Sequence, residues 1–246
     1  MKKVNYLFIL MASLGLTIFS RPLMAVEIGL GARIGFEGAL TSVTFPLRIP
    51  YQEGQLGLDY LQPINGAVTG GLFMDFRLTP KFSITPALNV SVNRKSTYSM
   101  LFIDTKTNEQ TQLDETITAV THSFDAEILL KYHAKWWYFG FGAGVSLNTK
   151  PTLTYNTTEE GARIFPEIDN TKAHWGANVI FDTGYYFPID YFQRHHILLG
   201  WRTTFDVKGI IDSVKIQTDP YDTNTNIYAI SWASMALSLG YVFYIR

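Results

Sequence analysis

Residues 136–148 read WWYFGFGAGVSLN, and this stretch decides the fold. Its odd-numbered positions carry only apolar side chains: Trp137, Phe139, Phe141, Ala143, Val145 and Leu147. Its even-numbered positions between these carry Tyr138, Gly140, Gly142, Gly144, Ser146 and Asn148. A β-strand sends alternate side chains to opposite faces. The stretch therefore predicts a strand with one apolar face and one face of mostly small or polar side chains.

The same alternation recurs along the chain and predicts eight antiparallel strands. The other strands are expected near residues 28–36, 68–78, 82–92, 124–132, 175–187, 197–207 and 235–245. Pro86 lacks a backbone donor and predicts a bulge or a broken pair in its strand. No internal repeat and no break in composition divides the chain, so one domain is expected.

The connections between the expected strands alternate in length. Long polar stretches run to about residue 67, then over about 94–121, 149–171 and 208–226, and the second is expected to be partly a β-hairpin. Short turns are expected at residues 79–81, 133–135 and 188–194. This order is typical of an up-and-down β-barrel with short turns at one end and long loops at the other.

Composition excludes several functional classes. The 246 residues include no cysteine, 17% charged residues and a net charge of -1. Binding to nucleic acid calls for a basic patch or stripe, which this balance does not offer. Without cysteine, disulfides and thiolate metal sites are excluded, and no cofactor is expected.

The N-terminus has the pattern of a secretory signal peptide. Lys2 and Lys3 precede an apolar run to Phe19, and the segment that follows ends on the small residue Ala25. We expect cleavage after Ala25, which leaves residues 26–246 as the mature barrel domain. The alternative is a retained membrane anchor, but the run is shorter than the ~20 residues that a spanning helix needs.

Alternation alone does not say which face of the strands points inward. A soluble lipocalin-like barrel has the same period with its apolar side chains inside. Two features of the non-apolar face favour a barrel that faces lipid. This face is rich in glycine, which suits a narrow lumen, and it holds the charges, which are costly on a lipid face. The residues expected to form a polar network in the lumen are Arg33, Glu37, Asp75, Arg77, Asp125, Glu127, Lys131, Asp182, Arg202 and Asp206.

Aromatic residues at both ends of the expected strands give a third reason. Transmembrane barrels carry an aromatic girdle at each membrane interface. Near the short turns these residues are Tyr132, Trp137, Tyr185, Phe187, Tyr241 and Phe243, and near the long loops they are Trp175 and Phe205. The sequence therefore predicts an eight-stranded transmembrane β-barrel, closed because every backbone group in hydrocarbon must be paired.

Several segments resemble a known family. GLGARIGFEG, GGLFMDFRLTPKFSITPALNVS, FDAEILLKYHAKWWYFGFGAGVSL and ALSLGYVFYIR are similar to the outer-membrane β-barrel domain family of Bacteroidetes-like bacteria, related in architecture to small OmpX/OmpA-type barrels. The resemblance implies a Gram-negative outer membrane, periplasmic termini and extracellular long loops. Expected partners are outer-membrane lipid, the barrel-insertion machinery and an extracellular ligand of the loops. It implies no catalytic residues.

Three functions remain open at this level. The first is a structural or surface-binding barrel with a charge-plugged lumen, the second a narrow, porin-like channel for ions or small solutes, and the third a membrane hydrolase or acyltransferase. His122, Ser123 and Asp125 lie near a rim, but His122 and Ser123 point to opposite faces of a strand, so no enzyme is expected. Residues 222–226 have the start of a calcium loop, yet Ile227 and Ala233 replace its glycine and glutamate, so no metal is expected.

Overall fold

A computed structural model describes residues 27–43, 49–51, 54–60, 65–104, 106–107, 109–156, 171–211 and 229–245. The expected signal peptide therefore lies outside the described residues. Eleven strands are described: β1 (Glu27–Val43), β2 (Ile49–Tyr51), β3 (Gly54–Tyr60), β4 (Asn65–Thr79), β5 (Phe82–Asp104), β6 (Gln110–Ala134), β7 (Trp137–Asn148), β8 (Thr152–Asn156), β9 (His174–Pro188), β10 (His195–Asp206) and β11 (Ala229–Ile245). Among the described residues, no helix has the length and apolar character needed to cross a membrane.

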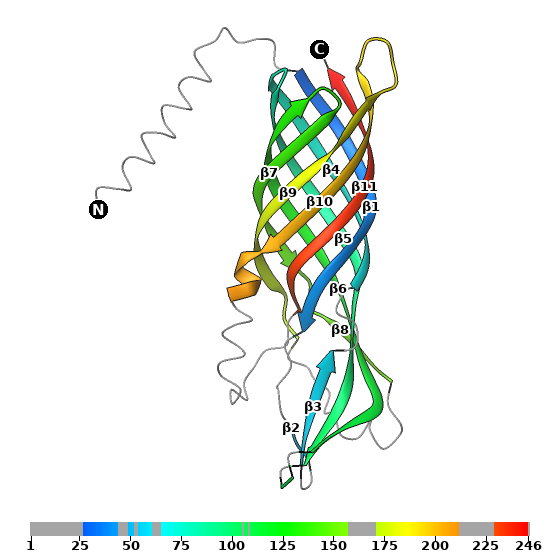
Figure 1. Ribbon diagram of the computed structural model, residues 1–246, viewed down its shortest axis with the longest axis vertical. Helices are drawn as coiled ribbons and strands as arrows, with labels where there is room; N and C mark the ends of the chain where they lie inside the picture. The colour runs from blue at the N-terminus through cyan, green and yellow to red at the C-terminus, as the bar shows by residue number, and fades with distance from the viewer. Residues whose placement is uncertain are drawn as a thin grey trace, which may run out of the picture.

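Eight of these strands form a closed ring. Each pairs antiparallel with the next in the order β1, β4, β5, β6, β7, β9, β10 and β11, and β11 pairs back with β1. The predicted eight-stranded up-and-down barrel is therefore confirmed (Figure 1). We call the end with the short connections the turn end and the opposite end the loop end.

The remaining three strands belong to a sheet that projects from the loop end (Figure 1). β5 and β6 continue past the ring as one long hairpin, β3 pairs with the outer part of β5, β2 pairs with β3, and β8 pairs with β6. The expected partial hairpin over residues 94–121 is present and is longer than expected, because strand structure runs through most of this stretch. At about 3.3 Å per residue, the eleven residues 94–104 project roughly 35 Å.

A β-bulge marks the point where β5 leaves the ring. Ser91 pairs with Ser123 and Arg94 pairs with Thr121, so two residues of β5 oppose one of β6. Asn93 lies in the bulge with φ of 64°, in the left-handed region that asparagine tolerates better than most residues. An extra residue reverses which face each later side chain occupies. Arg94 is therefore buried, although alternation from Ser91 would turn it outward.

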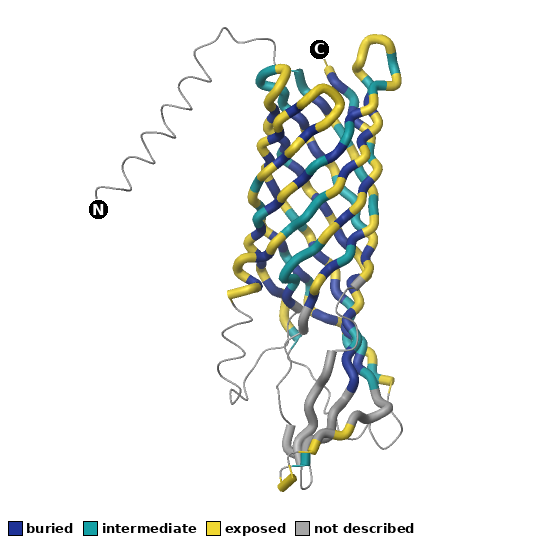
Figure 2. The backbone as a smooth tube through the Cα atoms, in the orientation of Figure 1, coloured by how far each residue is buried: buried dark blue, intermediate teal, exposed yellow. Residues whose placement is uncertain are grey.

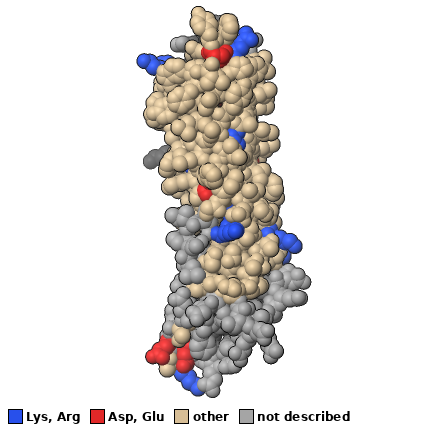
Figure 3. Space-filling model, turned by 90° about the vertical axis from the view of Figure 1, so that its right-hand side faces the viewer, with Lys and Arg blue, Asp and Glu red and all other residues tan. Residues whose placement is uncertain are grey.

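Exposure follows the predicted alternation around the ring (Figure 2). Phe139, Phe141 and Leu199 are about half exposed on the outer wall, whereas Asp182 and Glu127 are buried inside. Few charged atoms interrupt the outer wall in Figure 3. The barrel therefore turns its apolar face outward, which is the arrangement expected against hydrocarbon and the reverse of a soluble barrel.

Glycines on the inner face allow the strands to crowd the narrow lumen. A Cβ atom on Gly31 would lie 2.2 Å from the ring of Phe73, and one on Gly35 would lie 2.0 Å from the backbone oxygen of Leu237. Gly66, at the loop end of β4, has nothing within 4 Å of the same position. Close packing in the lumen therefore requires glycine at positions such as Gly31 and Gly35.

Two local predictions are refined by the pairing. The expected turn at residues 133–135 was wrong by about two residues, because β6 runs to Ala134 and His133 lies buried in the lumen. Pro86 stays in register with Ile128 of β6, but the β4–β5 ladder contains no pair between those of Phe73 and Phe76. The predicted broken pair therefore occurs on the β4 side.

Candidate functional site: the polar lumen

Ion pairs cross the middle of the lumen. Arg33 of β1 contacts Glu127 of β6 with Nη2 2.9 Å from Oε1, and contacts Asp182 of β9 with Nη1 3.2 Å from Oδ2. Arg202 of β10 also pairs with Glu127, and Arg33 donates to the side-chain oxygen of Asn89 at 2.9 and 3.1 Å. Because these residues come from strands all around the ring, their side chains fill the bore.

A second group lies toward the loop end. Arg94 pairs with Glu37 at 2.5 Å between Nη2 and Oε1 and donates to Asn148 at 3.1 Å. Asp125 accepts a hydrogen bond from Ser123, and Asp206 accepts from the backbone N–H groups of Ala177 and Gly209. No lysine or arginine in the described part of the chain lies within ion-pair distance of Asp125 or Asp206.

A cavity separates the side chains of this loop-end group. It leaves about 40 Å³ for the centres of water molecules and is lined by Arg33, Glu37, Arg94, Asp125, Arg202 and Asp206, among others. One buried water needs roughly 10–15 Å³ by this measure, so the space suits a few waters. Unpaired polar atoms face this part of the lumen, including Nε of Arg94 and Oδ2 of Asp206. A small polar pocket, rather than an open pore, occupies this part of the barrel.

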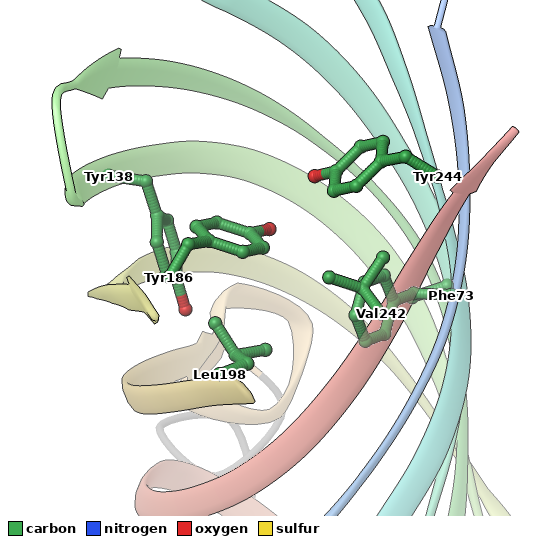
Figure 4. Close-up of a cluster of buried hydrophobic side chains, with 7 residues drawn as sticks. Phe73, Tyr138, Tyr186, Leu198, Val242 and Tyr244 are labelled. Atoms are coloured by element: carbon green, nitrogen blue, oxygen red, sulfur yellow. The ribbon is translucent and has the colours of Figure 1, made fainter. Parts of the chain in front are cut away.

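Aromatic side chains close the lumen toward the turn end. We call this layer the aromatic plug; it consists of Phe73, Ala87, Tyr138, Tyr186, Leu198, Val242 and Tyr244. Figure 4 shows six of them converging on the lumen from β4, β7, β9, β10 and β11. The rings of Tyr138 and Tyr186 lie 5.0 Å apart between centroids. This layer leaves little room for solute to pass.

Charged side chains are built into the aromatic plug. Nζ of Lys131 lies 4.5 Å from the ring centre of Tyr138 and 3.9 Å from Oδ2 of Asp182. Arg77 lies over Tyr244 at 4.3 Å, and the hydroxyl of Tyr244 donates to Asp75 at 2.5 Å. Cations over aromatic faces are stabilised by the ring quadrupole. The plug is therefore held by cation–π contacts as well as by packing.

All ten residues expected in the lumen network lie on the inner face, but they do not form one cluster. Arg33, Glu127, Asp182 and Arg202 meet in the middle, Glu37 joins Arg94, Asp75 and Arg77 lie in the plug, and Lys131 links the plug to Asp182. Asp125 and Asp206 lie apart on the wall of the cavity.

Sequence reasoning missed two parts of this site. It did not include Arg94, because the bulge at Asn93 breaks simple alternation. It also gave no role to the inward tyrosines, although Tyr138, Tyr186 and Tyr244 all occupy the polar face of their strands. A large aromatic on a face otherwise made of small residues is the signal that could have predicted a plug.

The residues considered for catalysis do not form a triad. His122 lies on the outside and accepts a hydrogen bond from the backbone N–H of Asn93, whereas Ser123 and Asp125 lie inside. Residues 222–226, considered for calcium, lie outside the described residues. In the part of the chain that the structure describes, no cluster of three or more His, Cys, Asp or Glu side chains is arranged for a metal ion.

The predicted girdle residues all lie on the outer wall. Tyr132, Trp137, Phe187 and Tyr241 are exposed near the turn end, and Tyr185 and Phe243 are half-buried beside them. Trp137 packs on Tyr185 with ring centres 3.7 Å apart. Toward the loop end, Trp175 and Phe205 are exposed on β9 and β10. Aromatic side chains therefore occur at both ends of the apolar wall.

No protein-family model matches this sequence, and no curated protein matches it. Similar solved structures include Ail of Yersinia pestis, in complex with a heparin analogue, which is 8% identical, with 89% of this chain and 100% of that chain covered and a TM-score of 0.42. OprG from Pseudomonas aeruginosa is 12% identical, with 89% and 96% covered and a TM-score of 0.44. The outer-membrane protease OmpT from Escherichia coli is 8% identical, with 93% and 100% covered and a TM-score of 0.40.

These solved structures are small outer-membrane β-barrel proteins. The fold assignment of this chain rests on its own strand pairing rather than on that likeness. The finer resemblance to Bacteroidetes-type and OmpX/OmpA-type families stays a prediction.

Proposed function

We propose that this protein is an integral outer-membrane β-barrel with a closed lumen that acts at the cell surface through the sheet and loops at its loop end. The observation that carries the proposal is the ring itself, with apolar side chains outside and ion pairs plus an aromatic plug inside. The outer wall of such a barrel is apolar and can contact lipid directly. Its filled lumen leaves little space for solutes to pass.

The proposal includes an orientation in the membrane. Residues 1–25 act as a signal peptide, the turn end faces the periplasm, and the loop end faces the exterior. Bacterial outer-membrane barrels place short turns on the periplasmic side and long loops outside. The partners are then outer-membrane lipid and, during assembly, the barrel-insertion machinery.

Cysteine labelling tests this orientation, because the native chain has no cysteine. Glu109→Cys places a single thiol in the connection between β5 and β6, and Lys81→Cys places one in a turn at the opposite end. On intact cells, a membrane-impermeant maleimide is expected to label Glu109→Cys and not Lys81→Cys. Labelling of Lys81→Cys alone would show the reverse orientation, and labelling of neither would exclude the surface location.

A narrow channel is the second candidate function, and the polar cavity at the loop end is the observation that favours it. We expect purified protein in planar bilayers to show no steady single-channel current. Steady currents whose size changes in Arg33→Ala or Arg202→Ala would contradict the proposal of a closed barrel and would support the channel function. Tyr186→Ala removes part of the plug and shows whether an artificial opening is detectable in the same assay.

The projecting sheet is the part of the molecule suited to a surface ligand. Thr97, Thr118 and Thr154 lie side by side across β5, β6 and β8, and two of their hydroxyls are 3.3 Å apart. Binding residues are often carried by loops on a rigid scaffold. Replacing residues 95–120 by a short turn is expected to abolish adhesion of cells to a surface that presents the ligand of the projecting sheet. Unchanged adhesion would reject this role.

We propose no enzymatic role. His122 lies on the opposite face from Ser123, and His133, whose Nε2 is 2.8 Å from the hydroxyl of Ser83, is buried with it in the lumen. Incubation with lipid and peptide substrates is expected to yield no product. Turnover that is lost in His133→Ala but not in His122→Ala would contradict this view.

A further inference from the structure

The outer wall of the barrel is hollowed on the side formed by β5, β6, β7, β9 and β10. The hollow has a volume of about 600 Å³, and the side chains that line it include Phe82, Tyr132, Phe139, Phe181, Thr183 and Trp201. We call it the wall groove. Binding sites for small molecules measure about 300–1,000 Å³, so the wall groove has the size of a binding site.

Two threonines among large aromatic side chains produce the wall groove. Strand pairing sets Thr183 of β9 between Phe139 of β7 and Trp201 of β10. Thr203, the next outward-facing residue of β10 after Trp201, pairs with Phe181 of β9. Both threonines are half-buried, whereas the three aromatic residues are exposed. A short side chain beside large rings leaves a depression with aromatic sides.

The hydroxyl groups of both threonines are engaged within the wall itself. Oγ1 of Thr183 donates to the backbone oxygen of Tyr138 at 2.9 Å, and Oγ1 of Thr203 accepts from Nε1 of Trp201 at 3.2 Å. Neither hydroxyl therefore requires a polar partner from a ligand. A polar group in the groove would lose its hydrogen bonds to water, which is costly. A hydrocarbon chain is the occupant that suits this surface.

The wall groove begins at the aromatic girdle of the turn end. Tyr185, which packs on Trp137, lies two residues from Thr183 along β9, a distance of about 7 Å at the rise of a strand. Interfacial aromatic residues mark the headgroup level of a membrane. The groove therefore lies at the depth of the acyl chains, next to the headgroups of the leaflet at the turn end.

Two exposed lysines lie just beyond this end of the groove. Lys81 precedes Phe82, and Lys135 follows Tyr132 by three residues. The backbone N–H of His133 donates to the carbonyl oxygen of Lys81 at 2.7 Å, which joins the two turns that hold these lysines. No carboxylate in the described ranges lies within ion-pair distance of either amine. A lipid with one chain in the groove has its headgroup at the level of both amines.

We propose that the wall groove binds one acyl chain of a phospholipid with a net negative headgroup, and that the headgroup phosphate contacts Lys81 and Lys135. The inference rests on the proposed membrane location, but not on which end of the barrel faces the periplasm. A neutral lipid would satisfy the groove without needing both amines, and a soluble anion would satisfy only the amines. A side chain from a second barrel would fill the groove and leave the amines unused.

The test uses the mature protein refolded in detergent and phosphatidylglycerol as the probe, with phosphatidylcholine of the same acyl chains for comparison. Native mass spectrometry over a lipid concentration series measures the lipid that the barrel retains. The native protein is expected to retain a single phosphatidylglycerol molecule, and Thr183→Leu/Thr203→Leu, which fills the groove, is expected to lose it. A lysine near the membrane surface contributes about fivefold in affinity, so Lys81→Gln/Lys135→Gln should bind this lipid roughly 25-fold more weakly.

Two matched controls accompany these variants. Ala32→Leu/Ala126→Leu adds apolar bulk to exposed positions of the outer wall away from the groove, and Lys150→Gln/Lys172→Gln removes two exposed lysines at the loop end. Both controls are expected to retain phosphatidylglycerol like the native protein. A gel-shift assay for folding checks every variant.

Three results would overturn the inference. The first is equal retention by the native protein and the filled variant Thr183→Leu/Thr203→Leu, or an equal loss in the alanine control. The second is equal retention of phosphatidylcholine by the native protein. The third is a dimer of the native protein that the filled variant abolishes, which would assign the groove to a second copy. Because the measurement is made in detergent, its failure would leave the surface location tested by cysteine labelling unaffected.

Discussion

Arg33 and Glu127 join β1 to β6 across the lumen, although these strands are not neighbours in the ring. Their side chains are almost completely buried, and Glu127 is shared with Arg202 from a third part of the wall. A contact of this kind holds opposite walls at a fixed separation. It therefore bears on both the stability of the barrel and the width of its bore.

Removal of Glu127 is predicted to destabilise the barrel strongly. Glu127→Ala leaves Arg202 without its ion-pair partner and Arg33 with Asp182 alone, and loss of one partner in a buried pair costs about 3–5 kcal/mol. Urea unfolding in lipid vesicles, followed by tryptophan fluorescence, measures the loss. The double variant Glu127→Met/Arg202→Met should regain part of it, and a loss below about 1 kcal/mol in Glu127→Ala would contradict the cross-lumen role.

Two glycines of the same ring are predicted to differ in their tolerance of alanine. Gly35→Ala forces a methyl group against the backbone of β11 and should cost about 1–3 kcal/mol. Gly66→Ala meets no atom within 4 Å and is the matched control. Equal unfolding free energies for the two variants would show that the lumen is less crowded than the structure indicates.

A charge on the outer wall is predicted to be costly. Leu199 lies half exposed in the middle of β10, so Leu199→Arg should lower the free energy of unfolding by about 2–4 kcal/mol in lipid vesicles. Leu199→Val keeps the apolar character and is expected to change it much less. If both variants unfolded alike, Leu199 would not face lipid.

The bulge at Asn93 is predicted to favour residues that accept a positive φ. Asn93→Val should cost about 1–2 kcal/mol, because a β-branched residue is strained in the left-handed region. Asn93→Gly should fold at least as well as the native chain. The same unfolding assay compares the two, and a stable Asn93→Val variant would argue that β5 passes this point without the bulge.

The barrel could be predicted from the sequence because one face of each ring strand is almost uniformly apolar. Phe139, Phe141 and Leu199 belong to this face, on which every second residue is apolar as contact with hydrocarbon requires. No charged residue interrupts the alternation. The projecting hairpin could not be predicted in full, because strands outside a membrane need no apolar face and Thr97, Thr118 and Thr154 give only a weak signal.

The lumen was predicted in composition but not in arrangement. The sign of each charge is given by the residue type and its face follows from alternation, whereas the choice of partner depends on which strands meet across the bore. Arg94 required knowledge of the bulge, and the pairing of Arg33 with Glu127 required the closed ring. Neither the position of the bulge nor the closure of the ring can be determined from a single sequence.

The long β5–β6 hairpin has a mechanical consequence. The two strands run without interruption from the ring into the projecting sheet, so a pull on that sheet acts along their axes. Hydrogen bonds of an antiparallel pair lie perpendicular to the strands. Tension along β5 and β6 therefore loads the hydrogen bonds that join them to β4 and β7 together in shear, instead of opening these bonds one by one. The hairpin can thus serve as a stiff tether anchored in the bilayer.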